Sequence, residues 1–567
     1  MRGQRHAGAV VVLLILTAAG RTLLADRSRS QGFDEPAHIA AGMEWLQKGT
    51  YQLDPLHPPL ARIAIALPLR WAGGQFPESE PKAASDFWAV GNSILYNDGH
   101  YLRNLFLARS GMLLFFVLAA AVVFFWTRRE FGDLAAVVAV ALFTTLPIVL
   151  AFSSLAYTDL PAASLQFVTL LVFATWLDKP TLQSSLLLGT FAGLAVLSKF
   201  TTLLFLPAAA LAIVLCKWWG SIRPEQPLNS AHRRWPMRVA TAAIVAAMVV
   251  WGGYRFSLGH VRETMQISTQ SMPSFQHFPG PVREVARMAI VSDWMVPAPA
   301  LLRGLAVAWV FNKSEPEAYL FGRMKTGGWW YFFLVATAVK TPLPFLLLTV
   351  IGFRALFRLA RQALWTQLAP AAAALAILGV TTGVNTNYGL RHVLVIFPLL
   401  ATVAGQGAAA LWRFSGKWRA WGRWTLAGLL AWQAVSTMRA QSDYIAYFNE
   451  LAGQDPSKIL VTGCDLDCGQ DLFQLAQELR ARHVSHVGIA VWSSADLSQM
   501  GLPHFSVLQP FQPATGWIAV GVRSRRVGDV LHTTYPPAAF AWLASYRPVA
   551  AVGKTISLYY IPESPPT

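Results

Sequence analysis

Long apolar runs separated by short charged stretches make up most of the chain. Runs such as AVVVLLILTAAG (9–20) and MLLFFVLAAAVVFFW (112–126) suit membrane-spanning helices, which need about 20 mostly apolar residues. Comparable runs occur at roughly 8–25, 105–127, 133–152, 160–177, 184–198, 201–217, 238–256, 328–352, 366–384, 389–412 and 424–440. This pattern predicts a polytopic α-helical membrane protein with about 11 transmembrane helices.

The composition supports this class. Of the 567 residues, 54% are hydrophobic and 13% are charged, whereas soluble domains carry about 25% charged residues. A formal net charge of +17 would indicate nucleic-acid binding in a soluble protein, but no basic stripe lies on a soluble segment here. Basic residues retained on the cytoplasmic side of membrane spans account for the charge, so we expect no nucleic-acid partner.

The distribution of Lys and Arg predicts the orientation. If the N-terminus is cytoplasmic and the first span is uncleaved, the loops at 125–133, 217–238, 353–362 and 412–424 lie inside, and all are rich in Lys and Arg. The opposing short loops near 152–159 and 384–389 contain neither residue. This asymmetry follows the positive-inside rule.

Three long segments then fall outside the membrane, at 27–104, 257–327 and 441–567. The first two are too apolar for plain connectors and are expected to contain helices lying in the membrane interface. The last alternates a potential helix (471–483) with potential strands (487–492, 516–522 and 556–562). We therefore predict a transmembrane domain over 1–440 and a small extracytoplasmic α/β domain over 441–567.

The chain has three cysteines, too few for a disulfide-scaffold protein. Cys216 falls in a predicted span. Cys464 and Cys468 form a bridge only if a turn or helix brings their Cβ atoms together, and two free thiols are an equal alternative.

Acidic residues mark the outer ends of two predicted spans. The stretch GFDEPAHIAAG (32–42) places Asp34 and Glu35 just beyond the first span, where a solvated helix N-terminus would also favour acids. Asp34 and His38 are four apart and would share a helix face, and the rigid His57-Pro58-Pro59 follows. Asp159, in SSLAYTDLPAAS (153–164), also fits the simpler interpretation of a helix cap. Together, Asp34 and Asp159 predict two carboxylates at one membrane level.

Cationic residues are expected at the same outer level. Lys199 lies in the hairpin between two predicted spans, and Arg391 and His392 open another. Each could instead extend its charged end to lipid headgroups. Lys340 lies inside an apolar run before a Pro-x-Pro kink, where a charge is costly and indicates function. Acids that activate a hydroxyl and cations that receive a phosphate point to transfer from a lipid-phosphate donor.

Several motifs then show a family resemblance. GFDEPAHIAAG with a downstream HPPL, the TDLP loop, KTPLP, NYGLRH, and YFNELAG with DLDCGQDL resemble bacterial glycosyltransferases of family 39. These are relatives of protein O-mannosyltransferases and of the lipid A aminoarabinose transferase, within the C-type glycosyltransferase superfamily. The resemblance covers about 30–560. It implies the fold of that superfamily, a bacterial inner-membrane location, a polyprenyl-phosphate sugar donor and a hydroxyl acceptor on protein, lipid or glycan.

The resemblance also implies roles for individual residues. Asp34 matches the position taken as catalytic base, and Glu35 would support the acceptor or the loop. Asp159 would organise the donor phosphate, and a divalent cation (Mg or Mn) held by Asp34 and Asp159 stays open. Arg391 and His392 resemble family positions that hold the lipid phosphate, and Lys340 matches a family feature without an assigned role. From their positions alone, Lys199 is expected as a further phosphate contact, and His38, His57 and Lys340 as supporting residues. Cys468 departs from the Trp found in most relatives, so the role of its loop is open.

Two other classes fit part of this pattern. A secondary transporter or lipid flippase would use the same acids and cations to move an ion or an anionic lipid, but such proteins often show paired halves with charges near the midplane. A non-catalytic envelope scaffold would rely on 441–567. Loss of activity on removing one carboxylate, without loss of fold, would separate a transferase from a scaffold. A requirement for an ion gradient would identify a transporter.

Overall fold

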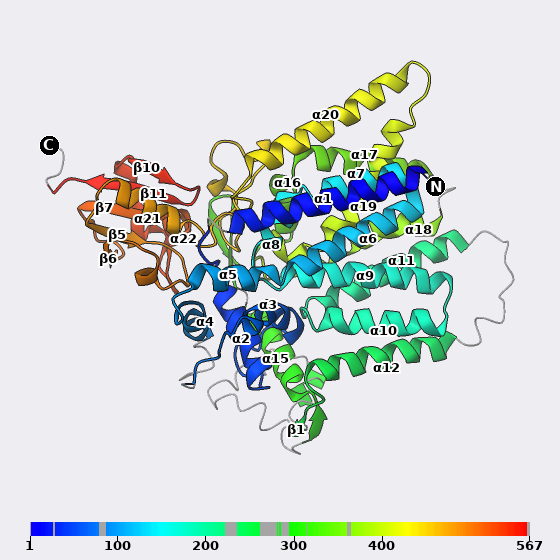
Figure 1. Cartoon of the computed structure of the whole chain (residues 1–567), viewed down its shortest axis with the longest axis horizontal. Coiled ribbons are helices and arrows are strands. Elements are labelled where there is room, and N and C mark those ends of the chain that lie inside the picture. Colours follow the sequence, from blue (N-terminus) through cyan, green and yellow to red (C-terminus); the bar gives the residue numbers. More distant parts are fainter. Residues whose placement is uncertain are drawn as a thin grey trace.

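The computed structural model describes residues 2–26, 29–78, 87–221, 235–260, 294–314, 316–359 and 364–563, and a few single positions between 280 and 288. Its long helices run side by side, with the N-terminus at one end of the helical region and the C-terminal sheet at the other (Figure 1). The helices of the first outer segment lie at the same end as the sheet. The first outer segment and the C-terminal sheet therefore lie together, away from the N-terminus.

Every apolar run identified in the sequence contains helix. The helices are α1 (Arg2–Asp26), α5 (Tyr101–Ser110) with α6 (Leu113–Phe131), α7 (Asp133–Phe143) with α8 (Pro147–Ser153), α9 (Asp159–Asp178), α10 (Leu182–Val196), α11 (Thr202–Ser221), α12 (Trp235–Gly253), α16 (Phe332–Lys340) with α17 (Leu343–Leu359), α18 (Trp365–Thr381), α19 (Ile396–Trp412) and α20 (Trp418–Arg439). Within the described residues, five spans are long and apolar enough to cross a membrane, or seven if each of two bent pairs counts as one. The mostly helical membrane class is confirmed, while the count of about 11 spans stays a prediction.

Prolines shape both bent pairs. Pro147 begins α8 after a bend of 64° from α7. The run 328–352, predicted as one kinked span, is instead two helices that meet at 117° around Pro342. A proline inside a helix removes one backbone hydrogen bond and clashes with the preceding turn, so a break at these positions is expected. Lys340 is therefore the last residue of α16, at a bend, and is not in the middle of a straight span.

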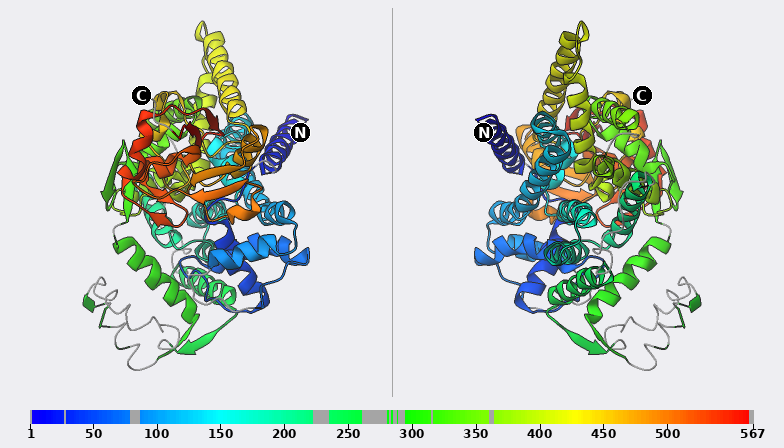
Figure 2. Two further views of the ribbon diagram at one scale, coloured as in Figure 1. Left: turned by 90° about the vertical axis from the view of Figure 1, so that its left-hand side faces the viewer. Right: turned by 90° about the vertical axis from the view of Figure 1, so that its right-hand side faces the viewer.

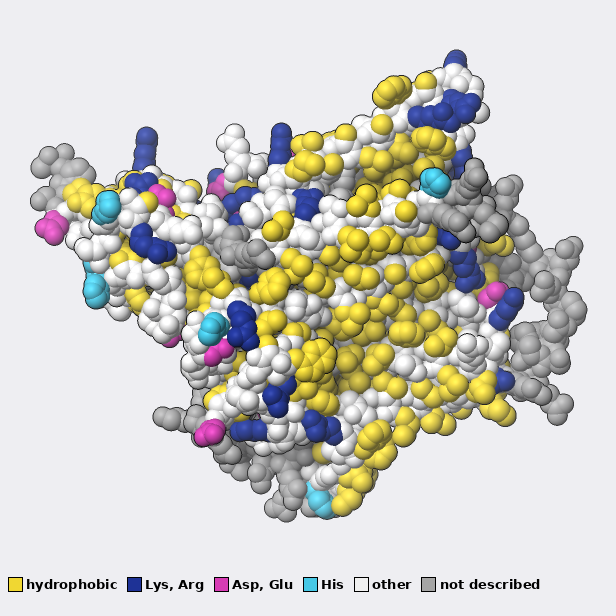
Figure 3. Space-filling model, in the orientation of Figure 1, with side chains coloured by type: hydrophobic (Ala, Val, Ile, Leu, Met, Phe, Trp, Pro, Cys, Tyr) yellow, Lys and Arg dark blue, Asp and Glu magenta, His cyan; other side chains and the backbone are white. Residues whose placement is uncertain are grey.

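The outer flank of the helical region is apolar. Hydrophobic side chains cover the helices in the middle of the molecule, and Lys and Arg gather toward the ends (Figure 3). α1 projects from one side of the bundle, and α20 rises above it (Figure 2). Within the most apolar stretch of α1, only 17% of the residues are buried inside the protein. Apolar side chains such as Leu13 and Leu16 are exposed there, as expected for a lipid-facing helix.

The first outer segment folds into three short helices, α2 (Glu35–Gln47), α3 (Pro59–Trp71) and α4 (Phe87–Tyr96). Glycines let α2 pack closely on both neighbours: a Cβ on Gly42 would lie 2.2 Å from the Arg62 carbonyl oxygen, and one on Gly91 would lie 2.0 Å from that of Pro36. A larger side chain at either position would force α2 away. This packing fixes the start of α2, where Asp34 lies.

The second outer segment is partly described. It contains the strand pair β1 (Leu258–His260) and β2 (Met295–Pro297), helix α15 (Pro299–Lys313) and the hairpin β3 (Glu317–Leu320) and β4 (Arg323–Thr326). Helix α15 corresponds to the helices expected in this segment. The rest of that expectation, over 261–279 and 289–293, lies outside the described residues.

The C-terminal segment forms a five-stranded mixed sheet with the order β10-β11-β7-β5-β6. Its strands are β5 (His486–Ala490), β6 (His504–Val507), β7 (Gly516–Gly521), β10 (Ala550–Val552) and β11 (Ile556–Ile561). β5 pairs in parallel with β6 and β7, whereas β11 is antiparallel to β7 and β10. Helix α21 (Leu472–Ala481) precedes the sheet. The three predicted strands and the predicted helix are therefore present, and β6 and β10 are additional.

Candidate functional site

Four charged side chains from separate parts of the chain form one alternating series. Arg391, in the 3₁₀ turn Leu390–Val393, donates from Nη1 to Asp34 Oδ2 at 2.9 Å. The same nitrogen lies 3.9 Å from Asp159 Oδ2. Lys199, between α10 and α11, places Nζ 2.5 Å from Asp159 Oδ1. The structure thus brings together two predicted acids and two predicted cations.

One carboxylate oxygen of Asp34 has no hydrogen-bond partner among the described residues. It occupies the N-cap position of α2, yet its side chain makes no capping hydrogen bond. The carboxylate turns instead to Arg391 through Oδ2, and Oδ1 accepts no hydrogen bond from any described residue. The side chain remains 30% exposed. A partly exposed carboxylate with one unengaged oxygen can accept a proton from a bound hydroxyl.

Asp159 and Lys199 form the buried part of the series. Their side chains are 2% and 8% exposed, so neither charge is solvated and neither reaches lipid headgroups. Asp159 is the first residue of α9, but its carboxylate is engaged by Lys199 and approached by Arg391. Although burial opposes the charge of Arg391, the carboxylates of Asp34 and Asp159 raise its pKa, so the guanidinium stays protonated.

A small depression, partly open to solvent, lies beside this series. Its polar lining comes from α9, the α10–α11 connection and the turn that carries Arg391: Asp159, Gln166, Lys199, Thr201, Arg391 and His392. The side-chain oxygen Oε1 of Gln166 is buried without a hydrogen-bond partner. Two cations and several polar groups on one concave surface suit an anionic group such as a phosphate.

Three predicted histidines lie close to these cations. The rings of His38 and His57 are 5.2 Å apart, and Nδ1 of His38 has no hydrogen-bond partner. Burial, followed by nearby cations such as Arg62, lowers the pKa of His38 well below its usual value; burial and His38 do the same for His57. Burial and Lys199 lower the pKa of His392. All three imidazoles are therefore neutral at pH 7, and His392 would meet a phosphate through an N–H group rather than a charge.

Glu35 faces away from Asp34 despite their adjacency. Its buried carboxylate accepts hydrogen bonds from Nε and Nη2 of Arg109, both at 2.8 Å. It also accepts hydrogen bonds from the backbone N–H groups of Gly32 and Ala156, at 2.6 and 2.8 Å. These contacts tie the start of α2 to α5 and to the loop before α9. They fit support of the loop rather than contact with an acceptor.

Lys340 also has a supporting position. Its buried ammonium donates to the carbonyl oxygen of Ile445 at 2.5 Å and to that of Asp465, and lies 4.4 Å from the centre of the Phe448 ring. The Asp465 carboxylate in turn accepts the N–H of Leu390 at 3.0 Å. Lys340 therefore holds the loop that supports the turn carrying Arg391, and makes no described contact with the charge series itself.

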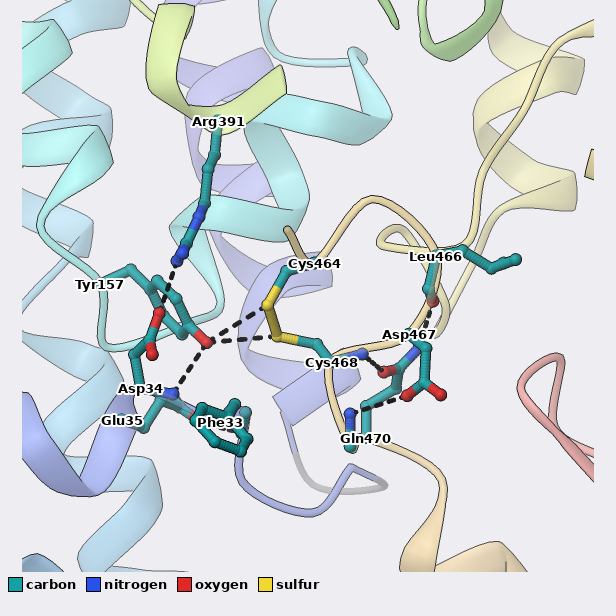
Figure 4. The surroundings of a disulfide bond; sticks show 12 residues. Phe33, Asp34, Glu35, Tyr157, Arg391, Cys464, Leu466, Asp467, Cys468 and Gln470 are labelled. Atoms are coloured by element: carbon teal, nitrogen blue, oxygen red, sulfur yellow. Dashed lines mark hydrogen bonds and ion pairs between the residues drawn. A yellow bond between two sulfur atoms is a disulfide. The ribbon is translucent and has the colours of Figure 1, made fainter. Parts of the chain in front are cut away.

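Tyr157 and a disulfide complete the surroundings of Asp34 (Figure 4). Cys464 and Cys468 are bonded to each other, which resolves the alternative left open by the sequence. The Tyr157 hydroxyl accepts the N–H of Asp34 at 3.1 Å and lies 3.4 and 3.2 Å from the two sulfur atoms. The guanidinium of Arg391 lies 4.8 Å from the centre of the Tyr157 ring.

Comparison with known families gives a match over one part of the chain. Residues 102–251 match the model of a family described as dolichyl-phosphate-mannose-protein mannosyltransferase. The predicted family resemblance is confirmed. The matched segment runs from α5 to α12 and includes Tyr157, Asp159 and Lys199. No curated protein matches the chain.

Solved structures of two proteins are similar to the chain. ArnT from Cupriavidus metallidurans in the apo state is 13% identical, with 98% of each chain covered and a TM-score of 0.49. The same protein bound to undecaprenyl phosphate is 12% identical, with 97% of each chain covered and a TM-score of 0.48. The oligosaccharyltransferase AglB from Archaeoglobus fulgidus, with an inhibitory peptide and a dolichol-phosphate, is 12% identical over 92% of this chain and 70% of that chain, with a TM-score of 0.45.

The donor set at Asp34 and Asp159 does not suit a divalent cation in this arrangement. Arg391 lies between the two carboxylates and Lys199 occupies the other oxygen of Asp159. Among the described residues, no group of three His, Cys, Asp or Glu side chains gathers as ligands. A hard cation would need several oxygen ligands where a guanidinium now lies.

Three residues of this site were missed by the sequence analysis. Arg109 lies within the apolar run at 105–127, so the same reasoning that selected Lys340 would have found it. Tyr157 is two residues before Asp159 but carries no charge to mark it. Asp465 lies in the DLDCGQDL loop, whose approach to the membrane domain only the fold reveals.

Proposed function

We propose that this chain transfers a sugar, a hexose or a pentose, from a polyprenyl-phosphate donor to an acceptor hydroxyl at the extracytoplasmic face of a bacterial inner membrane. The acceptor is a protein, lipid or glycan. The proposal extends the sequence-based assignment by giving each charged residue at the site a chemical task.

The carboxylate of Asp34 carries this proposal. It is partly exposed, has one oxygen without a described partner, and lies beside two cations that face the small depression. A base next to an anion-binding pocket is the arrangement needed when a hydroxyl attacks a carbon bonded to a phosphate. A purely structural carboxylate would instead have both oxygens engaged, as Glu35 does.

The reaction is a single displacement. Asp34 accepts the proton of the acceptor hydroxyl while the hydroxyl oxygen forms a bond to the anomeric carbon of the sugar. The bond from that carbon to the phosphate oxygen breaks, and its electron pair leaves with the polyprenyl phosphate. Arg391, Lys199 and an N–H of His392 stabilise the leaving phosphate. Attack opposite the leaving group inverts the anomeric centre.

The family match supports the donor class, because its description names a sugar carried on a polyprenyl phosphate. The orientation has separate support. The site and the C-terminal sheet lie at the end of the molecule opposite the N-terminus (Figure 1). Disulfides persist mainly in oxidising compartments, so the bond between Cys464 and Cys468 fits an extracytoplasmic location for this end.

The test measures free polyprenyl phosphate released from polyprenyl-phosphate mannose, and then from other polyprenyl-phosphate sugars, with an envelope extract as acceptor. We expect release by the wild type and a fall of about 10²-fold or more in Asp34→Asn, since a positioned base contributes at least that much. Asp178→Asn, at the exposed far end of α9, is the matched control and should retain wild-type activity.

A transporter or flippase would give a different result in this assay. Donor that crosses the membrane of proteoliposomes intact, with no polyprenyl phosphate released from any sugar donor, would identify a transporter or flippase. Release that is equal in the wild type and in a folded Asp34→Asn variant would remove Asp34 from the chemistry.

A further inference from the structure

The disulfide loop touches both halves of the proposed site. Cys464 and Cys468 are buried, at 2% and 0% exposure, in the segment that leads from the membrane domain to α21. Cys464 has a left-handed backbone with φ of 60°, which is unfavourable for a residue with a side chain. The covalent bond between the two cysteines, four residues apart, holds this turn closed (Figure 4).

One set of contacts runs from the loop to Asp34. The N–H of Phe33 donates to the Cys468 carbonyl oxygen at 3.1 Å, and the N–H of Asp34 donates to the Tyr157 hydroxyl, which lies against both sulfurs. Gly32 fits tightly here: a Cβ on it would lie 3.1 Å from the Tyr157 hydroxyl and 3.3 Å from Cys468 Sγ. A side chain at position 32 would therefore press on Tyr157 and on the disulfide.

A second set of contacts runs from the same loop to Arg391. The Asp465 carboxylate accepts the N–H of Leu390, the residue before Arg391, at 3.0 Å. Gly389 packs against Gly463, where a Cβ would lie 2.4 Å from the Gly463 carbonyl oxygen. Tyr157 joins the two sets, because its ring lies under the Arg391 guanidinium while its hydroxyl holds the Asp34 backbone.

We propose that the Cys464–Cys468 disulfide and Tyr157 are positioning elements for Asp34 and Arg391, and that reduction of the disulfide slows the chemical step. This inference rests on the proposed function for its effect on activity. Its structural part, that the bond fixes the backbone at Phe33, Asp34 and Leu390, is independent of the reaction.

Reduction changes the loop for a simple steric reason. A dithiol reductant supplies two electrons and two protons, the sulfur–sulfur bond breaks, and the reductant becomes a disulfide while both cysteines become thiols. Two thiols occupy more space than two bonded sulfurs. Because the Tyr157 hydroxyl already lies against both sulfurs, separation of the thiols moves the loop, and Cys464 is then free to leave its left-handed conformation.

The activity arm compares oxidised wild type with wild type treated with dithiothreitol, measuring kcat and donor KM for polyprenyl phosphate release. We expect kcat to fall about tenfold or more with donor KM changed by less than about threefold, because a small misplacement of reacting groups affects the chemical step most. Cys216→Ser removes the other thiol and should respond to the reductant as the wild type does. Cys464→Ser/Cys468→Ser should be slow with or without reductant.

The Tyr157 arm uses Tyr157→Phe, which keeps the ring but removes the hydroxyl. We expect a lower kcat at similar donor KM, with the matched variant Tyr444→Phe unchanged; the Tyr444 hydroxyl bonds to Gln441 and does not contact Asp34. Equal kcat in oxidised and reduced wild type, or in Tyr157→Phe and wild type, would overturn the proposed effect on the reaction.

The structural arm is hydrogen–deuterium exchange and needs no substrate. Reduction should speed exchange about tenfold or more at the amides of Phe33, Asp34 and Leu390, because the groups that accept their hydrogen bonds shift with the loop. Amides in the middle of α9 serve as the internal control. Unchanged exchange at all three overturns the positioning role. If exchange changes but the oxidised wild type transfers no sugar from any donor, the positioning role stands and the proposed function fails.

Discussion

Arg391 and Asp34 are 357 residues apart and form an ion pair of 2.9 Å. The pair links the start of α2 to the turn that leads into α19. It also places a guanidinium where it reaches Asp34 on one side and Asp159, at 3.9 Å, on the other. The group proposed to accept a proton and the group proposed to stabilise the leaving phosphate are thus held in one contact.

Arg391→Lys tests whether this double contact matters. Lysine keeps the charge, but its side chain is shorter and lacks the planar guanidinium that lies over the Tyr157 ring and brings Nη1 to both carboxylates. We expect kcat/KM for the donor to fall about 10²-fold, the typical cost of one stabilising donor. Thermal unfolding should change little. Arg439→Lys, on the exposed end of α20, is the control, and a wild-type rate in Arg391→Lys would contradict the proposed role.

Asp159 and Lys199 are predicted to depend on each other for stability. Lys199→Met leaves a buried carboxylate without its closest partner, and Asp159→Asn leaves a buried ammonium; each should cost about 3–5 kcal/mol. The double variant removes both charges and should cost clearly less than the sum of the two single changes. Thermal unfolding of all four proteins in one detergent measures this. Additive losses would show that the two side chains act independently.

Neighbouring Asp34 and Glu35 should give opposite results when neutralised. Glu35→Gln removes the negative charge that accepts hydrogen bonds from Nε and Nη2 of the buried Arg109, so we expect a lower unfolding temperature. Asp34→Asn should lose transferase activity while unfolding near the wild-type temperature, because its side chain is partly exposed and caps nothing. A Glu35→Gln protein that is stable but inactive would instead assign Glu35 a direct part in the reaction.

Much of the charge series could be predicted because charge is costly at a membrane boundary. Asp34, Asp159, Lys199 and Arg391 were selected from four separate motifs, and the structure places them in one chain of contacts. Because these residues contact one another, Asp159 is more than a helix cap, and Lys199 contacts a carboxylate and not lipid headgroups.

The sequence alone does not distinguish residues of the same charge that have different roles in the site. Lys340 was selected for its depth, yet its ammonium is satisfied by two backbone carbonyls, which no sequence pattern marks. Glu35 looks like Asp34 in sequence, but a turn at the start of α2 points the two side chains in different directions. The disulfide and Tyr157 depend on a loop that approaches from more than 300 residues away.

Removal of divalent cations should leave the activity nearly unchanged. Arg391 already lies between the two carboxylates that would hold a metal. We therefore expect the initial rate to change by less than about twofold after chelation with EDTA. A site that needed Mg²⁺ or Mn²⁺ would instead lose the ion, and the activity with it. Loss of activity that returns on adding Mg²⁺ or Mn²⁺ would show that a metal displaces Arg391 during the reaction.

The loop that holds the disulfide should make stability depend on pH. Burial raises the pKa of Asp467 from 3.8 to about 7, although its Oδ1 accepts the N–H of Gly469 at 3.0 Å. The folded protein therefore holds a proton that the unfolded chain releases. This contribution to stability is fully present below about pH 4 and is lost as the pH rises to about 7, at a limiting rate of about 1.4 kcal/mol per pH unit.

Asp467→Asn isolates this effect, because its amide oxygen can still accept the Gly469 N–H but does not titrate. We expect the unfolding temperature of the wild type, relative to that of Asp467→Asn, to fall between pH 5 and pH 7 and then to level off. Asp178→Asn, with an exposed carboxylate, should show no such trend against the wild type. A difference between wild type and Asp467→Asn that grows with pH would mean that the buried carboxyl is ionised in the folded protein and stabilised by its neighbours.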